Sequence, residues 1–262
     1  MEANSLKIIQ NYFPAVDHKN ARQFRTLFFV QNSISMNQTL IQAAIVDLDG
    51  TMVDTLADFA AALNGMLADL DLPAITPQTI ETMVGKGTEH LLHSVLNHAL
   101  AQTPPTPEAI NIEALYAQAW TRYQHHYLAI NGQFSQVYPG VLEGLRALQG
   151  RGWKLACLTN KPTAFALPLL QAKGLDGFFS HVFGGDAFER KKPDPLPLQK
   201  TCEALGTLPQ HTLMLGDSQN DAQAARAAGC PVLLVRYGYN HGEPVEAVDC
   251  DGLLDSLAEL TL

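Results

Sequence analysis

The sequence has few charged residues, few cysteines and no long apolar run. Asp, Glu, Lys and Arg together make up 16% of the 262 residues, and the formal net charge is −9. A chain with this acidic balance lacks the basic face that nucleic-acid binding requires, so we expect no nucleic-acid partner. No uninterrupted apolar stretch approaches the roughly 18 residues that span a bilayer, which predicts no membrane segment.

The four cysteines form no CxxC pair, and Cys157 lies in an apolar run that is typical of a buried strand. Isolated thiols of this kind are typical of a reducing compartment. The apolar run Leu27–Val30 is too short for the core of a secretory signal. We therefore expect a cytoplasmic protein with free thiols.

Residues 1–35 differ from the rest of the chain, because basic residues outnumber acidic ones there and the apolar residues follow no period. Three interpretations stay open for this N-terminal extension. It is a disordered tail or the product of an upstream start, a packed helix, or an organelle transit peptide. Met36 opens a more ordinary stretch.

From Ile41 onward, short apolar runs alternate with helical stretches, and turn residues bound each run. Short continuous apolar runs are typical of parallel strands that are buried on both faces. The pattern predicts an α/β fold with a doubly wound parallel sheet. The predicted strands are Ala43–Val46, Leu155–Leu158, Val182–Phe183, Leu213–Leu215 and Val232–Val235.

The stretch 55–135 interrupts this alternation, since it contains no convincing strand. It predicts an all-helical cap domain, inserted into a core domain that is formed by residues 36–54 and 136–262. The predicted helices of the insert are Leu56–Leu70, Pro77–Val84, Thr88–Ala101 and Pro107–Ile130.

Polar residues follow three of the predicted strands, at the carboxyl edge of the sheet where ligands bind in open α/β folds. Clustered carboxylates repel one another, and a hard divalent cation such as Mg²⁺ relieves this repulsion through oxygen ligands. The pattern therefore predicts a magnesium site. The residues concerned are Asp47 and Asp49, Thr159-Asn160-Lys161, and Gly216-Asp217-Ser218 through Asp221.

Such an edge suits phosphoryl transfer. A metal and a lysine would neutralise a phosphoryl group and the charge of its in-line transition state. One carboxylate could attack phosphorus, and a second could act as general acid and later as base. Lys192, which precedes Pro193, is the candidate lysine, although Arg190 and Lys191 beside it leave a solvated basic loop as the alternative.

Four motifs in order resemble those of the haloacid dehalogenase superfamily, and the helical insert is similar to the first type of cap in that superfamily. The match covers roughly residues 41 to 240. It implies a Rossmann-like core and a Mg²⁺ cofactor. The motifs are Asp47-Leu48-Asp49-Gly50-Thr51, Thr159-Asn160, Lys192-Pro193, and Gly216-Asp217-Ser218 through Asp221.

The resemblance implies a role for each charged residue. Asp47 is the nucleophile and a metal ligand, and Asp49 is the acid and base, with its backbone carbonyl also on the metal. Asp217 is the third metal contact from the protein. Lys192 bridges nucleophile and phosphate, while Asp221 orients Lys192 or a metal-bound water; a surface acid is the alternative for Asp221.

The resemblance also implies how the phosphoryl group is held. Thr159 and the amide of Asn160 bind the phosphoryl oxygens. The turn at Gly50 and Thr51 lets backbone amides approach the phosphate, as in other backbone anion sites.

In the predicted insert, the run Gly85-Lys86-Gly87-Thr88 is not a P-loop, because Gly87 separates the lysine from the threonine. We expect a flexible cap loop that closes over substrate, in which Lys86 could meet a substrate carboxylate; a plain turn with a solvated lysine is the alternative. Lys86 is the only lysine between residues 55 and 135, so a phosphonate hydrolase with a Schiff-base lysine also stays open.

Within the superfamily, several stretches resemble the phosphoglycolate phosphatases. This likeness predicts a monomeric or homodimeric hydrolase of a small phosphorylated metabolite, 2-phosphoglycolate. Open alternatives are a sugar-phosphate or amino-sugar-phosphate phosphatase, for example for N-acetylmuramic acid 6-phosphate, a phosphomutase, and a catalytically inactive binding protein. The stretches are Val84-Gly85-Lys86-Gly87, Tyr138-Pro139-Gly140-Val141, Leu158-Thr159-Asn160-Lys161-Pro162, Gly184-Gly185-Asp186 and Tyr237-Gly238-Tyr239-Asn240.

Overall fold

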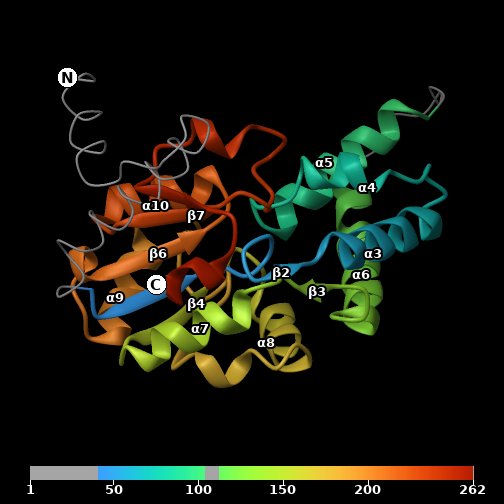
Figure 1. Ribbon diagram of the computed structural model, residues 1–262. Coiled ribbons are helices and arrows are strands. Elements are labelled where there is room, and N and C mark those ends of the chain that lie inside the picture. Colours follow the sequence, from blue (N-terminus) through green and yellow to red (C-terminus); the bar gives the residue numbers. More distant parts are fainter. Residues whose placement is uncertain (1–40, 104–111, 262) are drawn as a thin grey trace, which may run out of the picture. The chain divides into compact units, whose positions relative to one another are not determined.

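A parallel sheet of six strands forms the centre of the computed structural model, which describes residues 41–103 and 112–261 (Figure 1). The expected N-terminal extension, residues 1–35, and the start of the last predicted helix of the insert lie outside the described residues. The predicted α/β class with a parallel sheet is confirmed. In spatial order the strands are β5 (His181–Phe183), β4 (Lys154–Leu158), β1 (Ala43–Val46), β6 (Thr212–Gly216), β7 (Val232–Val235) and β8 (Gly252–Leu254).

Strand β1 lies between β4 and β6, and this position decides where the polar residues meet. Val46, the last residue of β1, is in register with Cys157 on one side and Leu215 on the other. Every residue of β1 and β6 is buried. The chain leaves β1, β4 and β6 at the same edge, so residues far apart in sequence become neighbours there.

Helices cover the sheet, which is why its central strands are mostly apolar. Helices α9 (Leu196–Leu205) and α10 (Gln219–Ala228) share a hydrophobic core with alternate residues of the strands, including Ile45, Met214 and Val232. The covering elements are α7 (Val141–Gly150), α8 (Thr163–Ala172), α9 (Leu196–Leu205) and α10 (Gln219–Ala228), with short 3₁₀ turns η1 (Asp176–Phe178), η2 (Pro209–His211), η3 (Val245–Ala247) and η4 (Leu257–Thr261).

A second group of helices follows the first strand and has its own hydrophobic core, in which Leu63, Met66 and Tyr123 are fully buried. Two short antiparallel strands, β2 (Val53–Asp54) and β3 (Gln136–Val137), pair where the chain enters and leaves this group (Figure 1). The helices are α3 (Leu56–Asp69), α4 (Pro77–Glu81), α5 (Thr88–Ala101) and α6 (Ile112–Ile130). Hereafter we call residues 55–135 the helical segment.

Candidate active site

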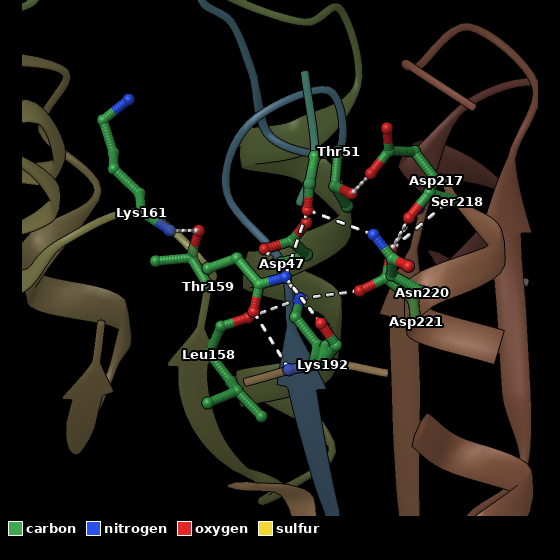
Figure 2. A network of polar contacts seen from close by, with 12 residues as sticks. Asp47, Thr51, Leu158, Thr159, Lys161, Lys192, Asp217, Ser218, Asn220 and Asp221 are labelled. Atoms are coloured by element: carbon green, nitrogen blue, oxygen red, sulfur yellow. Dashed lines mark hydrogen bonds and ion pairs between the residues drawn. The ribbon is translucent and has the colours of Figure 1, made fainter. Parts of the chain in front are cut away.

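The polar residues that follow β1, β4 and β6 meet in one network (Figure 2). Asp47 follows β1, Thr159 follows β4, and Asp217 follows β6. All three side chains are buried or nearly so. The sheet order therefore brings together the residues that the strand-end pattern predicted to lie close.

The ammonium group of Lys192 is the positive charge of this network. Its Nζ lies 2.9 Å from Asp47 Oδ1 and 2.6 Å from Asp221 Oδ1, and it donates to the carbonyl of Leu158 at 2.9 Å. Burial lowers the pKa of Lys192, but the carboxylates of Asp221 and Asp47 outweigh burial, and the net pKa is raised. Lys192 therefore stays charged, and oxygens of three protein groups surround its ammonium.

Asp221 is a buried structural partner of Lys192. It is the third residue of α10, where it forms a capping box with Ser218. While Oδ1 pairs with Lys192, Oδ2 accepts from the Ser218 hydroxyl at 2.8 Å. Gly216 permits this approach, because a Cβ there would lie 2.4 Å from the Asp221 side chain. Both oxygens of Asp221 are thus engaged within the protein.

Asp217 is held from two sides at the end of β6. Its Oδ1 accepts from the Thr51 hydroxyl at 2.8 Å, and its Oδ2 accepts from the Tyr239 backbone N–H at 2.6 Å. Gly50 and Gly238 pack so closely that a Cβ on either would come within 2.5 Å of Oδ2 of this carboxylate. Burial, followed by the nearby acids, raises the pKa of Asp217 well above its ordinary value. A carboxylate without a positive charge beside it is therefore energetically unfavourable at this position.

Asp47 carries the clearest sign of a missing partner. Among the described residues its buried Oδ1 has no hydrogen-bond partner, and its contact with Lys192 is an ion pair. Burial raises the pKa of Asp47 to about 7, and Lys192 opposes this rise. One oxygen each from Asp47, Asp217 and Asp221 lies within 4.8 Å of the others. This oxygen-only donor set fits a hard divalent cation.

The strand-end pattern placed Lys161 at this edge of the sheet without a role, and the structure pairs this second buried lysine with Asp49. Lys161 Nζ lies 2.9 and 3.2 Å from the two oxygens of Asp49. The same ammonium lies 4.4 Å from the ring centre of Phe59 and 4.7 Å from that of Tyr127, both in the helical segment. The one local signal for this role was the position of Lys161 directly after Thr159-Asn160.

The loop of the helical segment that contains Gly85 docks against the end of β4 and the start of α10. The carbonyl of Gly85 accepts from Asn160 Nδ2 and from Asn220 Nδ2, each at 3.1 Å. Asn160 also bonds both backbone polar groups of Lys192. Gly85 and Gly87 have φ values of +109° and +90°, which favour glycine.

A cavity lies between this loop and the strand ends. Lys86 does not line it: its side chain is exposed and belongs to a separate depression beside Glu189 and Lys191. The structure thus brings Gly85 and Gly87, but not Lys86, to the cavity. Predicted site residues on its wall are Asp47, Asp49, Thr159, Asn160, Asp217, Gly85 and Gly87.

The comparison with known protein families agrees with the parallel sheet and the polar residues at its strand ends. Residues 44–235 match the family model described as haloacid dehalogenase-like hydrolase. The chain belongs to this family. The match covers the parallel sheet and the ordered strand-end motifs.

Individual relatives indicate which kind of hydrolase this chain is similar to. The phosphoglycolate phosphatase of Thiobacillus denitrificans is 44% identical over 222 residues, which cover 85% of this chain and 95% of that protein. The phosphoglycolate phosphatase of Escherichia coli K12 is 36% identical over 84% of this chain and 91% of that protein. The crystal structure of a predicted phosphoglycolate phosphatase from Haemophilus somnus 129pt has a TM-score of 0.79 at 34% identity, covering 84% and 96% of the two chains. This chain is accordingly a phosphoric monoester hydrolase that acts on small phosphorylated compounds.

No helix in residues 41–103 and 112–261 is long and apolar enough to cross a membrane.

Proposed function

We propose that this protein is a Mg²⁺-dependent phosphatase that hydrolyses 2-phosphoglycolate through a covalent phosphoryl group on Asp47. The observation that carries this proposal is the environment of Asp47. In the part of the chain that the structure describes, its buried Oδ1 has no hydrogen-bond partner, Lys192 Nζ lies 2.9 Å away, and Asp49 lines the same cavity. The names of the two phosphatase relatives support the choice of substrate.

The side chains of Asp47 and Asp217, with the backbone carbonyl of Asp49, would hold the metal ion. Asp221 is the weaker candidate, since both its oxygens already accept hydrogen bonds from Lys192 and Ser218. When bound, Mg²⁺ would neutralise charge on the phosphoryl oxygens.

In the first step, an oxygen of Asp47 forms a bond to phosphorus while the bond from phosphorus to the ester oxygen breaks. Asp49 gives its proton to the departing ester oxygen. Lys192 balances negative charge beside Asp47. The Thr159 hydroxyl and the Asn160 backbone amide bind phosphoryl oxygens, which fixes the group for in-line attack.

In the second step, Asp49 acts as base and takes a proton from water as the water oxygen attacks phosphorus. The bond from phosphorus to Asp47 breaks, phosphate leaves, and Asp47 is regenerated. The loop at Gly85, held by Asn160 and Asn220, covers the cavity and limits the access of bulk water during this cycle.

The test is a panel of phosphomonoesters assayed with Mg²⁺ and with a chelator. We expect 2-phosphoglycolate to give the highest kcat/KM and the chelator to abolish turnover. A different phosphoester that wins with the same metal dependence would refute the substrate and keep the chemistry. Full activity in chelator would refute the metal.

A further inference from the structure

We infer that Lys161 binds the anionic group at the far end of the substrate and thereby selects phosphomonoesters that carry a carboxylate. This inference rests on the proposed function and deepens it. The strand-end motifs give roles to Thr159 and Asn160 but none to Lys161, which follows them.

The two buried lysines of the site differ in how their hydrogen bonds are used. Lys192 faces three oxygen acceptors, Asp47, Asp221 and the Leu158 carbonyl. The ammonium of Lys161 has one carboxylate, Asp49, as its hydrogen-bond partner among the described residues. Because an ammonium group has three donors and Asp49 takes two of them, Lys161 keeps one for an anionic ligand, whereas oxygens of three protein groups already surround Lys192.

Aromatic rings enclose the rest of the Lys161 ammonium. The ring faces of Phe59 and Tyr127 attract the cation and hold it in place, but they satisfy none of its N–H donors as an oxygen would. The side chain is 2% exposed, so water is largely excluded. A carboxylate that reaches this position would gain a strong charge-assisted hydrogen bond at low local dielectric.

Lys161 stands where the non-reacting end of a small phosphomonoester would lie. It is the one cationic residue among the described residues that line the cavity. Figure 2 shows its side chain pointing away from the carboxylate cluster, while Lys192 points into that cluster. A phosphoryl group beside Asp47 and Lys192 would thus leave the opposite end of the substrate toward Lys161.

The pairing of Lys161 with Asp49 shows what a substrate carboxylate would share or replace. Asp49 lines the same cavity and is the carboxylate that the Lys161 ammonium contacts among the described residues. A substrate carboxylate at this position would accept the same kind of charge-assisted hydrogen bond from Lys161.

The test compares two substrates of nearly equal size. 2-Phosphoglycolate carries a carboxylate, and 2-hydroxyethyl phosphate carries a neutral hydroxymethyl group at the same position. The measured quantity is the ratio of their kcat/KM values. For Lys161→Met we expect the ratio to fall roughly 10- to 100-fold, mainly through KM for 2-phosphoglycolate, as for loss of a hydrogen bond between charged groups. Lys161→Arg keeps the charge and should retain part of the ratio.

Two further variants serve as comparisons. Lys200→Gln removes an exposed lysine on α9 whose partner is Glu203, and its ratio should equal that of the unmodified enzyme. Lys86→Gln tests the competing cation of the loop, and its ratio should also be retained. Turnover of 2-hydroxyethyl phosphate reports on whether each variant is folded.

The outcomes separate the two proposals. An unmodified enzyme without preference for 2-phosphoglycolate would overturn the proposed substrate and this inference together. A clear preference that survives in Lys161→Met would overturn the inference alone, as would a loss seen in Lys86→Gln instead. If Lys161→Met slows both substrates equally, Lys161 acts through Asp49 and the inference is also overturned.

Discussion

Lys192 Nζ lies 2.6 Å from Asp221 Oδ1, and both side chains are almost completely inaccessible to solvent. Asp221 also caps the first turn of α10 through Ser218. One carboxylate therefore fixes the start of a helix and balances the lysine beside the nucleophile. The position of Lys192 depends on the correct folding of α10.

Asp221→Asn should reduce both stability and kcat. The amide of the variant carries no negative charge, so the buried ammonium of Lys192 loses one of its carboxylate partners. This loss should lower the free energy of unfolding by about 3 kcal/mol. Urea denaturation and steady-state kinetics would measure the two effects. Asp249→Asn breaks an exposed pair with Arg226 and should change stability by less than about 1 kcal/mol. Equal effects of the two substitutions would contradict the account of Asp221.

Tyr239→Phe should loosen the connection into the helical segment. The Tyr239 hydroxyl donates to Asp54 and accepts from the backbone N–H groups of Thr55 at 2.9 Å and Leu56 at 3.1 Å. We expect a loss of about 1–3 kcal/mol in the free energy of unfolding, because the buried N–H of Thr55 loses its acceptor. Thermal or urea unfolding measures this loss of stability.

Tyr237→Phe is the matched control, since that hydroxyl makes one hydrogen bond, to the Thr51 carbonyl. Its cost should be smaller than that of Tyr239→Phe. The reverse order would show that the Tyr239 hydroxyl does not anchor the connection.

Asn220→Ala should weaken closure of the loop at Gly85. The Gly85 carbonyl would lose one of its two amide donors but keep Asn160, so the fold should persist. We expect kcat/KM to fall about fivefold, as for one net hydrogen bond. Gln223→Ala, at an exposed position of the same helix, is the control. Unchanged kcat/KM in Asn220→Ala would exclude a contribution of this contact to closure.

Mg²⁺ affinity should rise with pH. Burial raises the pKa of Asp47 from 3.8 to about 7, so between these values the folded metal-free protein holds a proton that the unfolded chain releases. Its stability therefore falls as the pH rises through this window. Metal binding requires the ionised carboxylate, so affinity should increase from pH 6 toward 8, by at most about tenfold per unit below the pKa.

Calorimetric titration of Mg²⁺ in buffers with different protonation enthalpies would measure both affinity and proton release. Release should be larger near pH 6 than near pH 8. An affinity that does not vary across this range would contradict the raised pKa of Asp47.

The sequence predicted the parts of the fold that have a sufficient apolar pattern. All five strands expected from apolar runs are present; four of the runs are buried, and the fifth lies in the half-buried edge strand β5. Strands β2 and β3 have two residues each, and β8 is only partly buried. Such short elements carry no periodic signal, and their pairing depends on contacts that form after the chain has folded.

The same limit applies to the candidate site. Asp47 and Asp217 could be placed together because strand ends meet at one sheet edge. The contact of Lys161 with Phe59 and Tyr127 could not be predicted from the sequence, since it depends on how α3 and α6 approach the sheet. Sequence proximity favoured Lys86 because it lies between two glycines, yet the loop that brings those glycines to the cavity leaves the lysine exposed. The chemical roles of these residues stay predictions.

The most direct test of the account is to trap the enzyme during turnover of 2-phosphoglycolate with Mg²⁺ and to locate any covalent phosphoryl group by peptide mass spectrometry. The account predicts a phosphoryl group on Asp47, none in Asp47→Asn, and no turnover by that variant. Steady hydrolysis without a phosphoryl-enzyme, or with the group on another residue, would contradict it.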